Sequence, residues 1–266
     1  MGQEIGLPNQ RISSVDTLQM KHNTLQTIID WAKRFGAPPL FYAKALPFQR
    51  CFGVLGVLLL IVGSLWGLGF APEDYQQGNS FRIIFIHVPA SFLAQSCYML
   101  MGIAALLVLV WRMKLADVCI DCAARLGVGF TLISLITGTI WGKPTWGAWW
   151  VSDARTLSMV VLLFLYLGVI ALKRALDGQR SAERAAAMLV VVGLVNLPII
   201  RYSVDWWLTL HQPATFTLTA APSMPSSMWL PLLLNVIGLY ALFGCLLLRS
   251  MRVDVRMRHY GADWTL

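Results

Sequence analysis

Charged residues are scarce in this chain. Asp, Glu, Lys and Arg make up 13% of its 266 residues, whereas 57% are hydrophobic. Soluble domains carry about 25% charged residues. The shortage excludes an ordinary water-exposed surface and indicates that much of the protein faces lipid. Length alone allows one or two domains, but the apolar runs described below leave room for a single integral membrane bundle.

The cysteines of this chain are odd in number and lie mostly in apolar segments, which argues against a disulfide framework. There are five cysteines, and most lie in or beside apolar runs. Cys119 and Cys122 form a C-x-x-C, but the following residue is Ala123 instead of the His needed for covalent attachment of a c-type haem. We therefore interpret this pair as structural.

Two further motifs are missing. The sequence has no phosphate-binding G-x-x-x-x-G-K-[ST] loop, so we expect no enzyme activity here and assign any ATP hydrolysis to a partner subunit. Residues 1–47 contain no apolar core followed by a cleavage site, as a secretory signal would. They do carry a near-helical apolar stripe, which suits an amphipathic helix on the inner membrane surface or a flexible tail equally well. The stripe consists of Leu18, Leu25, Ile28, Ile29, Ala32 and Phe35.

Six apolar runs are long enough to cross a membrane, which takes about 20 residues. They lie at about 50–70, 84–111, 124–141, 156–173, 185–203 and 229–248. Backbone groups in lipid must pair within their own segment, so the runs predict an all-α integral membrane protein. The fifth run contains Asn196 and Pro198, and we expect a kink or an end there. We divide the chain into an N-terminal cytoplasmic segment (1–47), a six-helix transmembrane domain (48–249) and a basic cytoplasmic tail (250–266).

Basic residues are distributed unevenly between the two sides. All but four of the 21 Lys and Arg residues fall in the two terminal segments and in the second-to-third and fourth-to-fifth connections. The four on the other side are Arg82, Lys143, Arg155 and Arg201. The positive-inside rule therefore predicts that both termini are cytoplasmic. The net charge of +8 reflects the basic loops that orient the chain in the membrane, and we expect no nucleic-acid partner.

The second outer loop, predicted at 142–155, is rich in tryptophan. Trp141, Trp146, Trp149 and Trp150 fall within ten positions, and we expect Gly142, Pro144 and Gly147 to break the helix there. A belt of tryptophans at the headgroup level is one reading. A rigid apolar platform for a large flat ligand is the other, and we favour it.

Two histidines share the outer side with this loop. His87 lies at the outer end of the second helix, with Pro89 expected in its first turn, and His211 lies in the third outer loop, predicted at 204–228. A single histidine at a membrane face is usually an interfacial or hydrogen-bonded residue. Two beside a tryptophan platform favour a metal-ligand role, since neutral imidazole is a common metal ligand. We interpret His22 and His259, in the inner tails, as solvated.

Each charged residue near the platform has two possible roles. Arg155, Lys143 and Arg82 suit carboxylate binding on the ligand or headgroup contact by snorkelling. Asp153 suits capping of the fourth helix or positioning of Arg155 or a tryptophan N–H, and the two roles are compatible.

Together these motifs resemble the cytochrome c maturation protein C family, also called the haem exporter protein C family, a group of tryptophan-rich haem-handling membrane proteins. The resemblance covers about residues 47–248. It is carried by G-L-G-F-A-P-E-D-Y-Q-Q-G-N-S-F-R-I-I-F-I-H-V-P-A at 67–90, W-G-K-P-T-W-G-A-W-W at 141–150, N-L-P-I-I at 196–200 and D-W-W-L-T-L-H-Q at 205–212.

The resemblance implies a haem b bound without covalent bonds on the periplasmic side of the bacterial inner membrane. His87 and His211 match the axial ligands, and the platform comprises Trp141, Gly142, Trp146, Gly147, Trp149, Trp150 and Asp153. Arg155, Lys143 and Arg82 are weaker candidates for propionate or partner contacts. The implied partners are an ABC ATPase, a second permease and a small one-helix subunit. The haem is then passed to the periplasmic chaperone cytochrome c maturation protein E.

Three other readings compete with this one. The chain could be a permease that forms the haem route, a haem–cytochrome ligase or an assembly scaffold. The ligases are much longer and have extra histidines, and polar groups in the spans are few for a channel. One departure from the family pattern is Ser152, which stands where a Trp usually precedes the Asp and removes one stacking surface. Another is Thr156-Leu157, where Leu-Thr usually follows the Arg.

Overall fold

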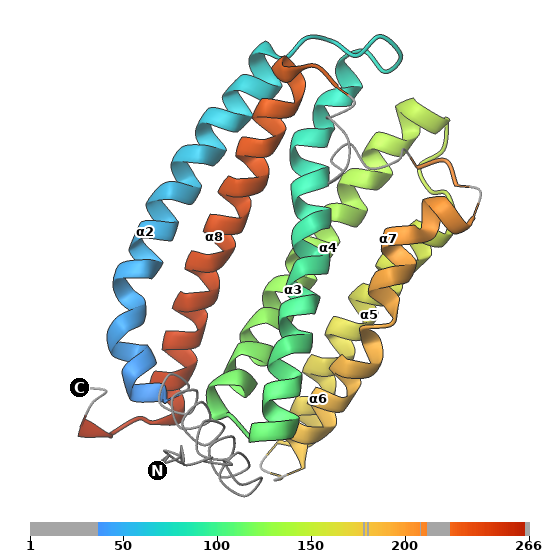
Figure 1. Cartoon of the computed structure of the whole chain (residues 1–266). Coiled ribbons are helices and arrows are strands. Elements are labelled where there is room, and N and C mark those ends of the chain that lie inside the picture. Colours follow the sequence, from blue (N-terminus) through green and yellow to red (C-terminus); the bar gives the residue numbers. More distant parts are fainter. Residues whose placement is uncertain (1–36, 178, 180, 208, 212–223, 264–266) are drawn as a thin grey trace, which may run out of the picture.

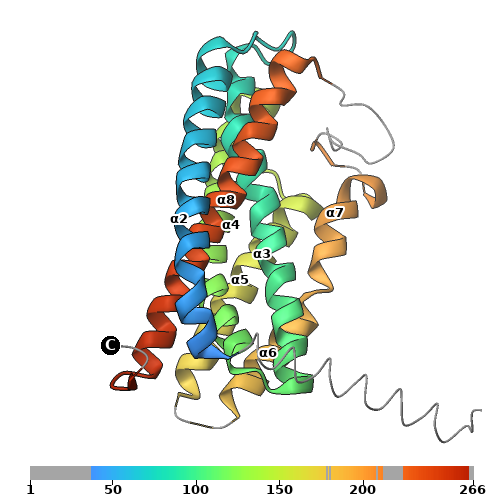
Figure 2. The same cartoon turned by 60° about the vertical axis from the view of Figure 1, so that its left-hand side comes forward.

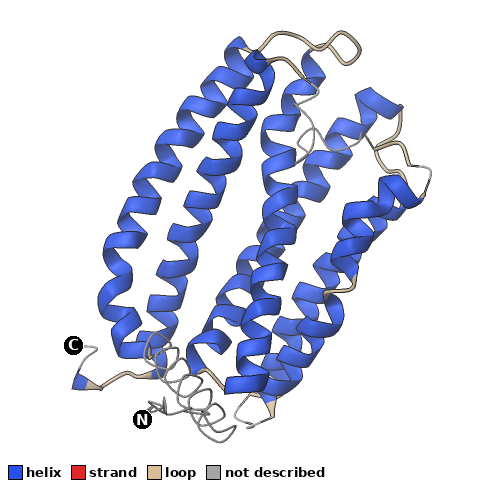
Figure 3. Ribbon diagram, in the orientation of Figure 1, coloured by secondary structure: helices blue, strands red, loops and turns tan. Residues whose placement is uncertain are grey.

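The computed structural model describes residues 37–263, apart from 178, 180, 208 and 212–223. This part of the chain is helical and has no strand (Figure 3). Six of its helical segments are long and apolar enough to cross a membrane, which confirms the predicted all-α multi-pass architecture.

The first span is α2 (Pro38–Ser64), continued by a π-helical turn (Leu65–Phe70). A 3-10 turn (Asn79–Ile83) leads into α3 (Ile84–Trp111), and α4 (Lys114–Trp146) and α5 (Ala154–Ala175) follow. The fifth span is built from α6 (Ala182–Gly193) and α7 (Asn196–Trp206), and the sixth is α8 (Ser226–Arg258).

Several predicted spans were too short. The third was expected from 124, but α4 begins at Lys114 and passes through Arg125 without interruption. The side chain of Arg125 is 55% exposed, and its guanidinium lies 4.0 Å from the carboxylate of Asp254 on α8. The fifth span is interrupted between Gly193 and Asn196, as its proline and asparagine suggested.

The proposed domain limits at 48 and 249 fall inside helices α2 and α8. They mark where the apolar composition changes, not where helices end, and the division stays a prediction. The amphipathic stripe predicted at 18–35 lies outside the described residues.

Helices α2 and α8 lie side by side along their length, next to the unit formed by α3 to α7 (Figures 1 and 2). Small residues allow this close contact: a Cβ atom on Gly56 would lie 2.6 Å from the backbone nitrogen of Leu242. Half of the most apolar window of α3 is buried, compared with 17% for α2. Helix α3 is therefore the central element on which a site can be held rigidly.

One end of the bundle is held by an ion-pair network joining α4, α5 and α8. The ammonium of Lys173 lies 2.5 Å from Asp117 and 2.6 Å from Asp121. Arg258 contacts both of these carboxylates and also Asp254. Since Asp117 is almost fully buried, its charge is compensated by these partners and the network clamps three helices together.

Candidate functional site

His87 is fixed on α3 by a contact with α4. Its Nδ1 lies 3.0 Å from the hydroxyl of Thr137, which itself donates a hydrogen bond to the carbonyl of Ile133 at 2.6 Å. Because a hydroxyl has one proton to give, Thr137 accepts from Nδ1–H of His87. This tautomer leaves Nε2 without a proton, so that it can accept a hydrogen bond or bind a metal. The hydroxyl of Ser91 lies 3.5 Å from this nitrogen.

The start of α3 differs from the prediction. Pro89 was expected in the first helical turn, but α3 begins at Ile84 and Pro89 lies inside it. The 3-10 turn that precedes the helix moves its start upstream. Space for the His87 ring comes from Gly138 on α4, since a Cβ atom there would lie 3.0 Å from Cε1 of the imidazole.

His211 lies in the loop after α7 and is held by Asp153. Its Nδ1 is 2.6 Å from Oδ2 of Asp153, whose Oδ1 accepts the backbone N–H of Thr156 at 2.8 Å. Asp153 is thus the N-cap of α5, as one of its two predicted roles required. Its second hydrogen bond is with His211, and its charge also acts on the nearby guanidinium of Arg155.

The electrostatics of this pair favour a neutral histidine. Burial lowers the pKa of His211, and the neighbouring Asp153 only partly offsets that effect. Burial alone would raise the pKa of Asp153, but hydrogen bonds from Thr156 and His211 hold this pKa below its usual value. A neutral imidazole beside a carboxylate donates Nδ1–H to it, which leaves Nε2 of His211 without a proton.

The tryptophan motif is divided between helix and loop, which corrects the prediction. Gly142 and Pro144 lie inside α4 and do not break it; the helix ends at Trp146, and Gly147 adopts the left-handed conformation with φ 79°. Trp141 and Trp146 are therefore helical. They pack edge-on against the two histidines, Trp141 on His87 at 5.6 Å between ring centroids and Trp146 on His211 at 4.8 Å.

Trp149 and Trp150 lie in the loop and are about half exposed. The indole N–H of Trp150 donates to the hydroxyl of Ser152 at 3.0 Å. Ser152 thus orients a neighbouring tryptophan. On the helical side, the indole N–H of Trp141 donates to the side-chain oxygen of Gln77 in the loop before α3.

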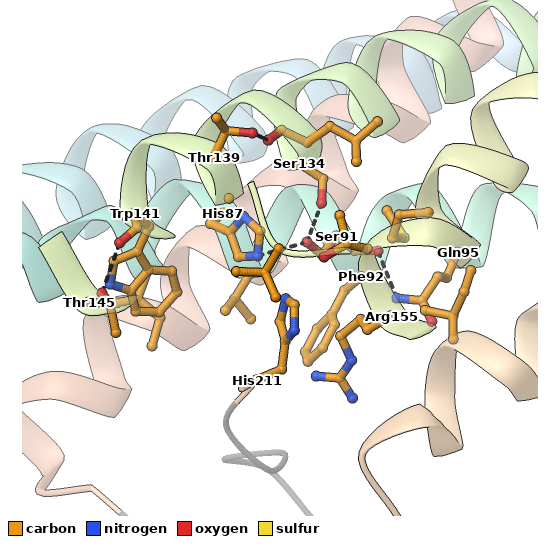
Figure 4. Close-up of a pocket in the computed structure, with 18 of the residues that line it drawn as sticks. His87, Ser91, Phe92, Gln95, Ser134, Thr139, Trp141, Thr145, Arg155 and His211 are labelled. Atoms are coloured by element: carbon orange, nitrogen blue, oxygen red, sulfur yellow. Dashed lines mark hydrogen bonds between the residues drawn. The ribbon is translucent and has the colours of Figure 1, made fainter. Parts of the chain in front are cut away.

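These side chains surround a cavity of about 490 Å³ (Figure 4). The volume lies within the range of about 300–1,000 Å³ found for small-molecule and cofactor pockets. Its outer part is lined by His87, His211, Trp141, Trp146, Trp149, Trp150, Arg155 and Arg201. Figure 4 shows His87 from α3 and His211 from the loop turned toward the same space, with Arg155 beside His211.

The remaining predicted residues do not line this cavity. Asp153 acts from behind His211, and Gly142 and Gly147 shape the backbone. Arg82 donates to the carbonyls of Leu68 and Ala71, and Lys143 donates to the carbonyl of Gly147 at 3.1 Å. These two cations hydrogen-bond to backbone carbonyls, whereas Arg155 and Arg201 line the cavity.

Sequence analysis missed Thr137 and Gly138, which set the position of His87. Their positions carried a usable signal: residues four apart share a helix face, and Thr137 lies four residues before Trp141. Among the described residues there is no cluster of three or more His, Cys, Asp or Glu side chains that could hold a bare metal ion. Two converging imidazoles in an aromatic cavity suit an iron that brings its own equatorial ligands, as in haem.

Comparison with known proteins identifies the family of this chain. The family model described as Heme exporter protein C matches residues 31–266, so the similarity extends beyond the 47–248 expected from the motifs. Heme exporter protein C of Escherichia coli (strain K12) is 49% identical over 227 residues, covering 85% of this chain and 91% of that protein. The protein of the same name from Bradyrhizobium diazoefficiens is 45% identical, covering 87% of this chain and 86% of the relative.

A plant relative extends the comparison to mitochondria. The putative cytochrome c biosynthesis ccmC-like mitochondrial protein of Marchantia polymorpha is 39% identical over 189 residues, covering 71% of this chain and 78% of that protein. The match along most of the chain, together with the six spans and the tryptophan-lined cavity, shows that this chain is a multi-pass membrane protein of the Heme exporter protein C family, which serves haem transport for cytochrome c biogenesis.

Proposed function

We propose that this protein binds haem at the periplasmic surface of the inner membrane and delivers it to a periplasmic haem chaperone. The observation that carries the proposal is the convergence of His87 and His211 on one cavity, each with Nδ1 engaged and Nε2 available. Haem iron accepts axial imidazoles. The haem is a non-covalently held b-type group in this proposal, and none of the five cysteines lines the cavity.

The other lining residues have distinct roles in this proposal. Trp141 and Trp146 restrict the two imidazoles, and Trp149 and Trp150 cover the porphyrin at the exposed rim. Arg155 and Arg201 are the cations at the cavity wall and are placed to pair with the propionates. Arg82 and Lys143 support this arrangement from the outer loops.

The proposed orientation places both termini in the cytoplasm. It rests on the excess of Lys and Arg at the end of the bundle where α2 begins and α8 ends. Tyr75 and Tyr260 are 91% and 85% exposed at opposite ends. A membrane-impermeant maleimide added to intact spheroplasts is expected to label Tyr75→Cys and not Tyr260→Cys. The reverse pattern would refute the orientation.

The proposed partners are supported by the membership of the chain in the Heme exporter protein C family and by the lack of a phosphate-binding loop in its sequence. We propose that an ABC ATPase, a second permease and a small one-helix subunit complete the complex. The receiving chaperone, cytochrome c maturation protein E, docks at the rim where Trp149 and Trp150 are exposed.

Haem content and visible spectrum test the proposal. The purified protein is expected to carry haem with a six-coordinate spectrum and to pass it to the purified chaperone. His87→Ala and His211→Ala are each expected to lose this spectrum, and the double variant is expected to lose bound haem. His259→Ala, at the other end of the bundle, serves as the matched control. Unchanged haem content and spectrum in all histidine variants would refute the proposed function.

A second candidate, a permease that forms the haem route, is supported by the depth of the cavity. The cavity follows one face of α3 from Ile84 to Ser96, a stretch that includes Gln95, and it also reaches Tyr240 on α8. Twelve helical residues span roughly 18 Å, which takes the cavity well into the membrane. Haem flux into liposomes containing this chain alone would favour the permease; flux only with the partner subunits would favour surface delivery.

A further inference from the structure

The two imidazoles that face the cavity are held by chemically different groups. His211 is backed by the carboxylate of Asp153 at 2.6 Å, whereas His87 is backed by the neutral hydroxyl of Thr137 at 3.0 Å. The side chain of Asp153 is 7% exposed and that of His211 is 19% exposed, so water screens their contact only weakly. The contact joins two positions 58 residues apart in the chain.

This difference affects how strongly each imidazole binds iron. A carboxylate that accepts Nδ1–H raises the basicity of the other ring nitrogen and fixes the ring orientation. The hydroxyl of Thr137 has a weaker effect because it is uncharged and already donates its own proton to Ile133. A more basic axial ligand favours ferric over ferrous iron and lowers the reduction potential of the haem.

Asp153 also has a structural role that must be separated from this one. Its Oδ1 caps α5 through the backbone N–H of Thr156, while its Oδ2 faces His211. Asparagine is as good an N-cap as aspartate. Asp153→Asn therefore retains an acceptor for the cap and removes the negative charge beside the imidazole.

We infer that Asp153 is a positioning residue that makes the two axial bonds unequal, with His211 the strong ligand for ferric haem and His87 the ligand that is exchanged first. The inference rests on the proposed function, because it presupposes that both histidines bind the same iron. It assigns a direction to haem release: the incoming ligand of a partner replaces His87, while His211 and Asp153 keep the iron in place. Asp153 is itself fixed to the bundle, since it is the N-cap of α5.

Spectroelectrochemical titration and ferric-haem binding test the inference on the full-length protein. Asp153→Asn is expected to move the midpoint potential to more positive values and to weaken ferric-haem binding by about 10–100-fold. Thr137→Val, the matched change behind His87, is expected to weaken binding by less than about tenfold, since it removes a neutral hydrogen bond. With imidazole as the probe ligand, the wild-type haem is expected to exchange a single axial ligand at low concentration. His87→Ala is expected to remove that exchange step.

A double-mutant cycle separates a positioning role from a loss of structure. Asp153→Asn is expected to have no further effect on haem affinity in a His211→Ala background and to keep its full effect in a His87→Ala background. Equal effects in both backgrounds, or an unchanged potential in Asp153→Asn, would overturn the inference. If instead the single histidine variants bind haem as the wild type does, the proposed function itself fails. The two failures are thus distinguishable.

Discussion

Helices α4 and α5 carry polar groups at both of their ends, and the two ends differ in what those groups contact. At one end Asp117, Asp121 and Lys173 pair with one another and with Arg258. At the other end Thr137 and Asp153 hold the Nδ1 atoms of His87 and His211, and both imidazoles line the cavity.

The comparison separates residues that stabilise the bundle from residues that can bind a ligand. Charges that neutralise one another over short distances have no capacity left for a ligand, and their effect is to hold helices together. Imidazoles that are held through Nδ1, in a cavity with aromatic walls, can still bind a ligand. The difference predicts that mutations at one end change stability and mutations at the other change haem binding.

The largest expected effect is on stability, at the ion-pair end. Lys173→Met leaves Asp117 and Asp121 with Arg258 as their remaining strong partner, and Asp117 is almost fully buried. Removing one partner of a buried ion pair costs about 3–5 kcal/mol. We expect a loss of that order in the free energy of unfolding, measured by denaturant titration in detergent. The exposed neighbour Arg174→Met is the control, at less than about 0.5 kcal/mol. A Lys173→Met variant that is as stable as the wild type but has altered haem ligation would contradict the assignment of this end of the bundle to stability.

A smaller effect is expected where α4 makes room for His87. In Gly138→Val a branched side chain meets Cε1 of the imidazole, since even a Cβ atom would lie 3.0 Å away. Displacing a metal ligand through its surroundings costs about 10–100-fold in affinity, and haem titration measures it. Gly129→Val, on the same helix at a position with open space around it, should bind haem like the wild type. Equal affinities in the two variants would contradict the observed placement of His87.

Third in size is the effect of the cations at the cavity wall. Arg155→Gln is expected to lower haem affinity by at least about tenfold, because a charge-assisted hydrogen bond contributes about 1.5–3 kcal/mol. Lys143→Gln, which affects a residue that does not line the cavity, is expected to change it by less than about threefold. Haem dimethyl ester, which lacks free carboxylates, should abolish the difference between Arg155→Gln and the wild type. A larger loss in Lys143→Gln than in Arg155→Gln would reverse this assignment.

The smallest effect is expected at the position that departs from the family motif. Ser152→Ala removes the acceptor for the Trp150 indole, an exposed hydrogen bond worth about 0.6 kcal/mol at most. We expect haem affinity to fall by no more than about threefold, measured by the same titration. A loss above tenfold would place Ser152 among the main haem contacts.

Sequence reasoning predicted the helices more reliably than their ends. Hydropathy identifies the apolar centre of a span, but α4 and α8 continue past it into charged residues. Those extensions are stable because Asp117 and Arg258 pair across helices that are distant in sequence. Local composition does not encode such pairing. Pro144 was expected to break the helix, yet α4 ends only where Gly147 supplies a left-handed conformation.

For the site, the sequence indicated the two histidines and the tryptophans but not the groups behind them. Helical periodicity from Trp141 could have suggested Thr137. The pairing of Asp153 with His211 spans 58 residues and depends on the tertiary structure that brings His211 to the N-terminus of α5. It required the three-dimensional structure.

The central claim, that His87 and His211 are the two axial ligands of one haem iron, is tested most directly by electron paramagnetic resonance of the ferric-haem-loaded protein. The account predicts a low-spin bis-imidazole signal in the wild type. It also predicts conversion to high-spin or to a different low-spin ligation in His87→Ala and in His211→Ala separately. A wild-type signal that persists in either single variant would contradict it.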